Sequence, residues 1–241
     1  MAWFSSHNET RYLGIDLGGS GVKIVECRNE QGVPRLTNYA FSQEPLETIG
    51  HRDIRDTPNE CAALIQDVLH KMKSSATKTI ASLPTFSVFS SVITVSGTDK
   101  AAINAEVQEK AKRIIPLPIE EMVVDWKIIA QTMASPSSAP NSSLSPATKE
   151  LIHEQPQKYS RVLLTAAQRK LVSRYIQIFK AAELELVSLE TEAFALMRSL
   201  LGNDKGPVMV VDIGAVTADL SIIKDLTPVL DRSLDMGGMH L

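Results

Sequence analysis

Two segments near opposite ends of the 241-residue chain repeat one pattern of apolar and polar positions. In each, a stretch with the pattern of a strand ends in Asp, a glycine-containing turn follows, and a second such stretch leaves the turn. Residues 12–26 have Asp16 before the turn, and residues 208–223 have Asp212, with Gly214 two positions later. Alternation with a period of two, and short apolar runs that end at turn residues, are typical of strands. Each segment therefore predicts a β-hairpin.

The remaining segments predict helices and strands in a mixed order. Apolar residues three and four positions apart predict amphipathic helices, and short apolar runs between turn residues predict further strands. The expected helices are 58–73, 100–115, 168–182 and 191–201. The further expected strands are 34–45, 79–84, 90–96, 123–131, 160–167, 184–189 and 228–234. This order predicts an α/β protein in which helices flank a mixed sheet.

The order of the elements also predicts three subdomains. Residues 11–90 and 168–205 form the first, and residues 91–167 form an inserted β-α-β-β subdomain. Within the insertion, residues 134–159 are rich in Ser and Pro and bury too little apolar area to offset their ordering entropy, so we expect a mobile loop there. Residues 206–241 form the start of a further, incomplete subdomain.

The composition is that of an ordinary soluble globular protein, with 44% hydrophobic and 22% charged residues. The formal net charge of −3 argues against a bulk nucleic-acid or anionic-membrane partner. Cys27 and Cys61 lack metal-ligand spacing and are expected to be reduced thiols. The N-terminus lacks the apolar core of a signal peptide, and no apolar run approaches the ~20 residues of a membrane span. We therefore expect a cytoplasmic protein.

The turn of the first hairpin has the composition of a phosphate site. It contains Gly18, Gly19, Ser20 and Gly21. Glycine has no Cβ atom, so another group can approach its backbone closely, and successive exposed N–H groups form a concave anion site. Asp16 and Lys23 flank the turn: amides and a lysine suit phosphate oxygens, and a carboxylate suits a metal ion or its water shell. The alternative is an ordinary hairpin in which Lys23 points to solvent.

The second hairpin offers a matching set, which implies two related half-domains that face one ligand. Its candidate binding residues, with the paired glycines downstream, are Asp212, Gly214, Ala215, Thr217, Gly237 and Gly238. Thr217 is either a hydroxyl donor to phosphate or a β-branched strand former, and Asp219 is a candidate for a solvated strand face. Asp16 and Asp212 are the candidate metal ligands, each acting through a water molecule.

The two hairpins, their order and the inserted block together resemble the actin-like (ribonuclease H-like) ATPase superfamily. Within it, the chain resembles the PilM family of type IV pilus assembly proteins, and next the related FtsA. Residues 14–23 are similar to the first phosphate motif of the PilM family, residues 208–223 to the second, and Gly237 with Gly238 to the paired glycines after it. Residues 117–126 resemble a segment of its inserted subdomain.

The resemblance implies a nucleotide-binding scaffold. Proteins of the PilM family bind ATP with Mg²⁺ in the cleft between their halves. They also capture the N-terminal tail of an inner-membrane partner, PilN, in a groove that involves the inserted, SHS2-type subdomain. The resemblance thus implies a cytoplasmic protein held at the inner face of the cytoplasmic membrane only through its partner. Other pilus assembly ATPases and self-association are further implied contacts, and nucleic acid is not.

The chain departs from the family after Gly238, where the family continues into the subdomain that contacts adenosine. We expect either a fragment or a reduced homologue, with two phosphate hairpins and little to hold the base. No residue stands out as a base that activates water, so we expect at most a weak ATPase. Two alternatives stay open: a sugar or acetate kinase of the same superfold, many of which open with Gly-Ile-Asp-Leu-Gly-Gly, and an FtsA-like cell-division protein.

Overall fold

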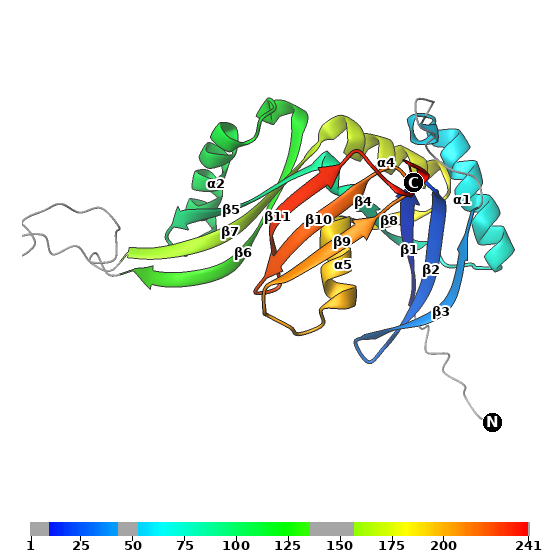
Figure 1. Ribbon diagram of the computed structural model, residues 1–241, viewed down its shortest axis with the longest axis horizontal. Coiled ribbons are helices and arrows are strands. Elements are labelled where there is room, and N and C mark those ends of the chain that lie inside the picture. Colours follow the sequence, from blue (N-terminus) through cyan, green and yellow to red (C-terminus); the bar gives the residue numbers. More distant parts are fainter. Residues whose placement is uncertain (1–9, 43–52, 135–156, 241) are drawn as a thin grey trace, which may run out of the picture. The chain divides into compact units, whose positions relative to one another are not determined.

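The computed structural model describes residues 10–42, 53–134 and 157–240 (Figure 1). The described residues gather into two compact units. One comprises the N-terminal part up to Val88 together with the part from Arg169 onward, and the other runs from Phe89 to Gln168. Most of the loop predicted at 134–159 lies outside the described residues. Among the helices that the structure describes, none has both the length and the apolar character needed to cross a membrane.

The first unit contains a five-stranded mixed sheet. Its strands are β1 (Arg11–Gly18), β2 (Gly21–Glu30), β3 (Val33–Phe41), β4 (Lys78–Leu83) and β8 (Glu185–Thr191). They lie in the order β3-β2-β1-β4-β8, with β1, β2 and β3 antiparallel and β4 parallel to both β1 and β8. The first predicted hairpin therefore occupies the middle of the sheet, because β1 lies between β2 and β4.

Two helices cover one face of this sheet: α1 (Pro58–Met72) and α4 (Arg169–Ala181). α1 packs against β2, β3 and α4, and α4 packs against β8. The covered face carries the alternate apolar residues of the hairpin, with Leu13, Ile15 and Ile24 no more than 3% exposed. Burial of each such side chain contributes about 1.5–3 kcal/mol. The apolar residues whose alternation predicted the strands therefore also hold the helices on the sheet.

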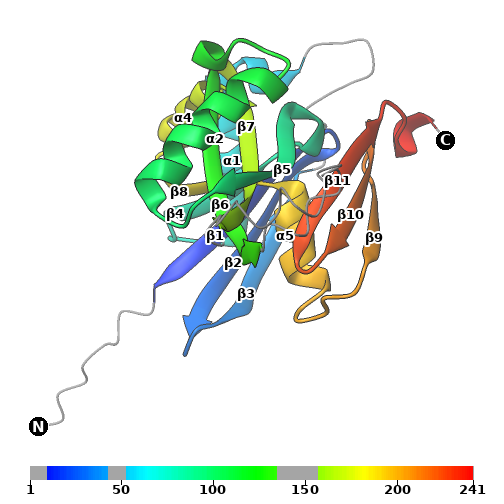
Figure 2. The same ribbon diagram turned by 90° about the vertical axis from the view of Figure 1, so that its left-hand side faces the viewer.

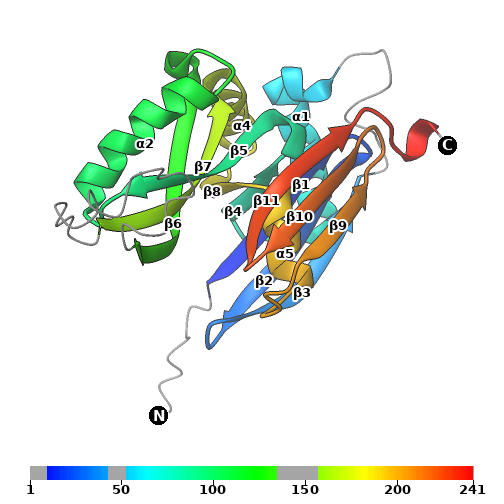
Figure 3. The same ribbon diagram turned by 60° about the vertical axis from the view of Figure 1, so that its left-hand side comes forward.

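A three-stranded antiparallel sheet completes the first unit. Its strands are β9 (Val208–Ile213), β10 (Ala218–Lys224) and β11 (Thr227–Leu234), in the order β11-β10-β9 (Figure 3). α5 (Glu192–Leu200) lies on one face of this sheet, where Met197, Val210 and Ile223 form a buried cluster. The second predicted hairpin is thus β9 and β10, and the strand predicted at 228–234 is β11.

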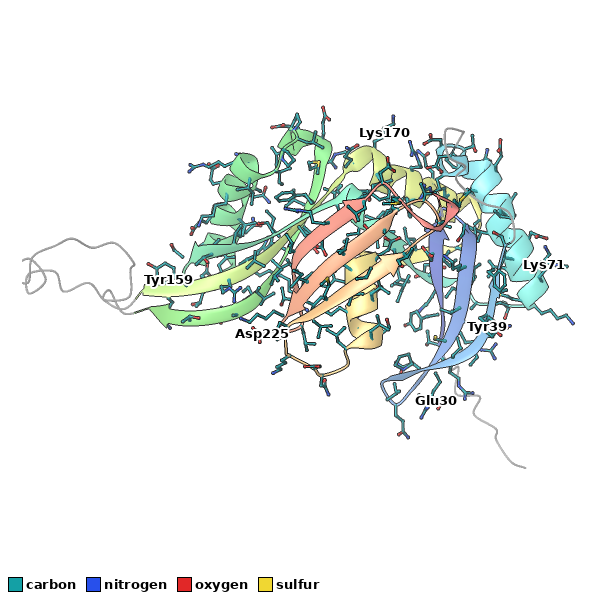
Figure 4. All side chains as sticks on the ribbon, viewed as in Figure 1. Glu30, Tyr39, Lys71, Tyr159, Lys170 and Asp225 are labelled. Atoms are coloured by element: carbon teal, nitrogen blue, oxygen red, sulfur yellow. The ribbon has the colours of Figure 1, made fainter. Side chains whose placement is uncertain are left out.

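The turn from β10 to β11 is built without glycine. Asp225 and Leu226 have positive φ angles of 52° and 53°, the backbone of a two-residue type I′ turn. Asp225 stands at the tip of this hairpin in Figure 4. The sequence carried no signal for this turn, because its usual signature is Asn-Gly or Asp-Gly. Leu226 packs against the cluster under α5, which helps to offset the cost of a left-handed backbone.

Short 3-10 helices occur in several connections. They are η1 (Ile54–Asp56), η2 (Thr85–Ser87), η3 (Ile119–Glu121) and η5 (Gly238–His240). η1 lies in a polar stretch directly before α1. Its Arg55 is nevertheless only 7% exposed. The side chain is buried because its charged end meets specific acceptors, as described below.

The second unit has the predicted β-α-β-β order. It consists of β5 (Val88–Ser96), α2 (Lys100–Ile114), β6 (Met122–Ala134) and β7 (Gln157–Gln168), with the strand order β5-β7-β6 (Figure 2). Asp99 caps α2, since its side chain accepts hydrogen bonds from two N–H groups of the first turn. Ile103 and Val107 of the helix are buried against Val162 and Leu164 of the sheet. The predicted fold class, a mixed sheet with flanking helices and an inserted β-α-β-β block, is confirmed.

Candidate functional site

The first glycine turn joins β1 to β2. Gly18 lies opposite Gly21 in the strand pairing, which leaves Gly19 and Ser20 as the two residues of the turn. Gly21 has a φ of 136°, a conformation that residues with a Cβ atom rarely adopt. The glycines that suggested a phosphate site thus also allow the chain to reverse so tightly.

Asp16 and Lys23 are cross-strand partners next to this turn. The Nζ atom of Lys23 donates a hydrogen bond to Oδ2 of Asp16 at 2.9 Å, and both residues line the same cavity. Lys23 is therefore not simply directed at solvent, which was the alternative. The lysine side chain is 54% exposed, and an exposed ion pair adds little to stability. Both groups thus stay accessible to a ligand.

The second turn, between β9 and β10, is braced by the paired glycines that follow β11. The N–H of Gly214 donates to the carbonyl of Thr217 at 2.9 Å, and the N–H of Gly238 donates to the carbonyl of Gly214 at 2.8 Å. A Cβ atom on Gly237 would lie 2.5 Å from the backbone of Ala215. Gly237 and Gly238 therefore support the turn through backbone contacts, and neither belongs to the described cavity lining.

The two turns meet, although they lie near opposite ends of the chain. A Cβ atom on Gly19 would come within 2.8 Å of Cγ2 of Val216. A cavity of about 770 Å³ is lined by both turns, a size within the range of small-molecule sites. The predicted binding residues that line it are Asp16, Gly18, Gly19, Ser20, Lys23, Asp212, Gly214, Ala215 and Thr217. The tertiary structure thus places both hairpins around one cavity.

Sequence reasoning missed one carboxylate that the internal repeat marks. Asp219, expected on a solvated face, is 7% exposed and accepts hydrogen bonds from the hydroxyl groups of Ser233 and Thr217. It pairs across the strands with Asp212, at the position that corresponds to Lys23 in the first hairpin. Aligning the two hairpins residue by residue would therefore have placed Asp219 at the cavity.

Two further residues of the cavity wall had no signal in the sequence. Arg55 comes from η1, and Glu192 is the first residue of α5. The carboxylate of Glu192 accepts a hydrogen bond from the N–H of Thr85 at 3.0 Å. Both residues lie far along the chain from either glycine turn, so only folding brings them to the cavity.

Burial and repulsion by neighbouring carboxylates raise the pKa values of two carboxyl groups in the cavity, those of Glu192 and Asp212. The pKa of Glu192 rises to about 7, mainly because the group is desolvated and also because Asp16, Asp219 and Asp212 lie near it; the hydrogen bond from Thr85 acts in the opposite direction. Burial, then Asp219 and Asp16, also raise the pKa of Asp212. The cavity therefore concentrates negative charge, which a bound cation would relieve.

The groups around the cavity fit a metal-bound phosphate. The N–H groups of the glycine turns and the Lys23 ammonium suit phosphate oxygens, and the carboxylates suit a divalent cation. Within the described parts of the chain, no three His, Cys, Asp or Glu side chains form a group that could hold a metal directly. Mg²⁺ usually keeps several of its water molecules, and the contacts of Asp16 and Asp212 through water stay a prediction.

The model of the family "Type IV pilus assembly protein PilM" matches residues 14–158 and 150–241. The chain belongs to the PilM family. The resemblance that rested on the two phosphate motifs and their order is confirmed.

Solved structures share the actin-like fold of this PilM-family chain. One is a PilM–PilN type IV pilus biogenesis complex, with a TM-score of 0.72 and 24% identity over 95% of this chain and 62% of that one. Another is the ethanolamine utilization protein EutJ of Carboxydothermus hydrogenoformans, with a TM-score of 0.50 and 15% identity over 96% and 54% of the two chains. A third is the cytoplasmic domain of EpsL, an inner membrane component of the type II secretion system of Vibrio cholerae. Its TM-score is 0.51, with 7% identity over 94% of this chain and 71% of that one. These matches show the fold, and this chain spans less than two thirds of the first structure's chain.

The contact between the two turns can be tested with Gly19→Ala. The added methyl group would meet Val216 at 2.8 Å, and such overpacking costs about 1–3 kcal/mol. We expect Gly19→Ala to lower the free energy of unfolding in urea by this amount, and Val216→Ala in the same chain to restore most of it. If the double variant loses as much free energy of unfolding as the two single variants lose together, the two turns do not touch.

The two downstream glycines provide a matched pair of variants. A Cβ atom at Gly237 would lie 2.5 Å from Ala215 backbone atoms, whereas at Gly238 the nearest atom would be 3.7 Å away. We expect Gly237→Ala to cost about 1–3 kcal/mol and to speed amide hydrogen exchange in residues 214–217. Gly238→Ala should change stability by no more than about 0.5 kcal/mol. Equal effects of the two substitutions would contradict the close backbone approach.

The raised pKa of Glu192 predicts a pH dependence of stability. The folded protein keeps this proton to higher pH than the unfolded chain, so the contribution of Glu192 to stability is full below about pH 4.5 and is lost as the pH rises to about 7. We expect the unmodified chain to lose roughly 1–3 kcal/mol more than Glu192→Gln between pH 4.5 and 8 in urea unfolding. Glu185→Gln, an exposed position, is the control. Identical pH profiles of Glu192→Gln and the unmodified chain would disprove the shift.

Proposed function

We propose that this PilM-family chain is a nucleotide-binding scaffold for type IV pilus assembly. It acts in the cytoplasm, at the inner face of the cytoplasmic membrane, through a membrane-bound partner. The observation that carries the proposal is the family match over residues 14–158 and 150–241, in a chain whose two glycine turns line one cavity.

ATP with Mg²⁺ is the proposed ligand of the cavity. The N–H groups of the two turns and the Nζ atom of Lys23 would hold phosphate oxygens, and Asp16 and Asp212 would hold Mg²⁺ through its water molecules. When bound, Mg²⁺ supplies positive charge that neutralises the phosphates and the surrounding carboxylates. This arrangement explains why a site with so many carboxyl groups would still take a nucleotide.

Glu192 is the cavity residue best suited to move a proton. With a pKa of about 7, its carboxyl is partly protonated and partly ionised near neutral pH, which is the condition for general acid or base action. In the ionised form it would accept a proton from water beside the phosphates. We propose at most a weak ATPase activity, because the scaffold role requires nucleotide binding rather than rapid turnover.

The proposed partner is the N-terminal tail of a PilN-like inner-membrane protein. A structure that matches 95% of this chain is a PilM–PilN complex, which supports this choice. The inserted, SHS2-type unit has two edge strands, β5 and β6, and an extended peptide can pair with a strand edge while pockets take its alternate side chains. Other pilus assembly ATPases and further copies of the chain are also proposed contacts.

A small-molecule kinase of the same superfold is the second candidate. Glu192 favours it, because a carboxyl with a pKa near 7 in a phosphate cavity suits the deprotonation of an acceptor hydroxyl. The family match weighs against this kinase and against an FtsA-like division protein. The scaffold therefore remains the better supported proposal.

Peptide binding tests the proposed partner. The N-terminal tail of the PilN-like protein from the same organism, labelled for fluorescence anisotropy, should bind with a dissociation constant on the order of micromolar, and Mg-ATP should change that constant. A scrambled peptide is the control, and a full-length PilM-family protein that contains this chain is measured alongside. Failure of the full-length protein to bind the tail, with or without Mg-ATP, would overturn the proposal. Phosphoryl transfer to a panel of sugars or acetate would establish the kinase instead.

A further inference from the structure

Arg55 is a buried cation in the wall of the cavity that no sequence motif marks. It lies in η1, directly before α1, and is 7% exposed. It nevertheless lines the cavity together with Asp16 and Glu192. Among the described lining residues, the other cationic side chain is Lys23. The position of Arg55 therefore calls for an explanation beyond packing.

The guanidinium group of Arg55 is fixed next to the first glycine turn. Its Nε atom donates to both carboxylate oxygens of Asp53, at 2.8 and 3.0 Å, and its Nη1 atom donates to the carbonyl of Leu17 at 3.1 Å. Leu17 immediately precedes Gly18, the first glycine of the turn. The arginine thus connects the segment before α1 to the backbone that shapes the turn.

A second ion pair holds the segment that carries Arg55. Arg174 of α4 lies 2.5 Å from Oδ1 of Asp56, the residue after Arg55. The contact of Arg55 with Asp53, before it in the sequence, and the ion pair of Asp56, after it, therefore restrict the side chain of Arg55 to one place. A group ordered before its ligand arrives loses less conformational entropy on binding.

The charge of the cavity explains why an arginine is held there. Asp16, Glu192, Asp212 and Asp219 all line the cavity, and a nucleotide adds further negative charge. Taking a guanidinium out of water costs free energy unless it is well paired, and Asp53 supplies one counter-charge. The planar fork of arginine matches two oxygens of one phosphate, which a lysine cannot do. Arg55 thus has the chemistry that the phosphates of a nucleotide require.

We propose that Arg55 is a further nucleotide-binding residue, which contacts the phosphate chain and positions the first glycine turn through the carbonyl of Leu17. This inference rests on the proposed binding of Mg-ATP in the cavity. It adds to the predicted set a residue that comes from neither hairpin. It also ties occupancy of the cavity to α4, because the segment that carries Arg55 is bonded to that helix.

Nucleotide titration of three variants tests this role. The dissociation constant for Mg-ATP is measured by isothermal titration calorimetry for the unmodified chain, Arg55→Lys, Arg55→Gln and the control Arg35→Gln. Arg35 is 67% exposed on β3 and pairs with Glu30, away from the cavity. We expect Arg55→Lys to weaken binding about tenfold and Arg55→Gln more, because charge-assisted hydrogen bonds are lost. Arg35→Gln should stay within about twofold.

The outcomes separate this inference from the proposed function. If the unmodified chain does not bind Mg-ATP, the proposed nucleotide site fails and the role of Arg55 fails with it. If the unmodified chain binds and both Arg55 variants bind equally well, only the inference about Arg55 is overturned. A loss of affinity that Arg55→Gln shows and that added ethylguanidinium partly restores would support a direct contact.

A measurement on the unmodified chain tests the inference even if the Arg55 variants fail to fold. In a ¹⁵N spectrum, the Nε–H signal of Arg55 should shift when Mg-ATP saturates the protein, because a phosphate would change the field at the guanidinium. The Nε–H signal of Arg35 serves as the reference that should stay in place. An unchanged Arg55 signal at saturation would overturn the inference without any substitution.

Discussion

The close approach of backbone segments at glycine is the constraint on which the cavity depends. At Gly19 the first turn touches Val216 of the second, and at Gly237 the segment after β11 lies against the backbone of Ala215. A methyl group at either place would force these segments apart. Asp16 of β1 and Asp212 of β9 line the cavity that these turns form. Glycine is needed here for the distance it permits between segments, and not only for the conformation of a turn.

Charge is the second constraint, and it acts against stability. Burial and mutual repulsion raise the pKa values of Glu192 and Asp212, so the folded protein holds these groups at a cost. Carboxyl groups perturbed in this way, gathered in one cavity, are typical of functional sites. The ammonium group of Lys23 acts in the opposite direction on the pKa of Asp212 and so offsets part of the cost. A ligand that brings a divalent cation would offset more.

The internal repeat shows what a sequence pattern predicts and what it does not. Ile15 and Leu17 of β1 are 3% and 2% exposed, whereas Val211 and Ile213, at the corresponding places in β9, are 53% and 65% exposed. Both pairs have the same alternation and the same antiparallel register with the next strand. The difference is in what covers them: α1 and α4 pack on the first sheet at this face, and α5 packs on the opposite face of the second sheet. Alternation thus predicts which residues share a face, but not whether that face is buried.

The sequence by itself determined the strands and helices, the two Asp–glycine turns, the inserted β-α-β-β order and membership of the PilM family. These features depend on spacing along the chain, which the order of residues contains directly. Only the tertiary structure decided that Asp219 is buried, that Arg55 lies in the cavity wall, and that Glu192 has a pKa near 7. Burial, ion pairing and repulsion depend on neighbours in space. Those neighbours come from segments far apart in the chain, and packing alone brings them together.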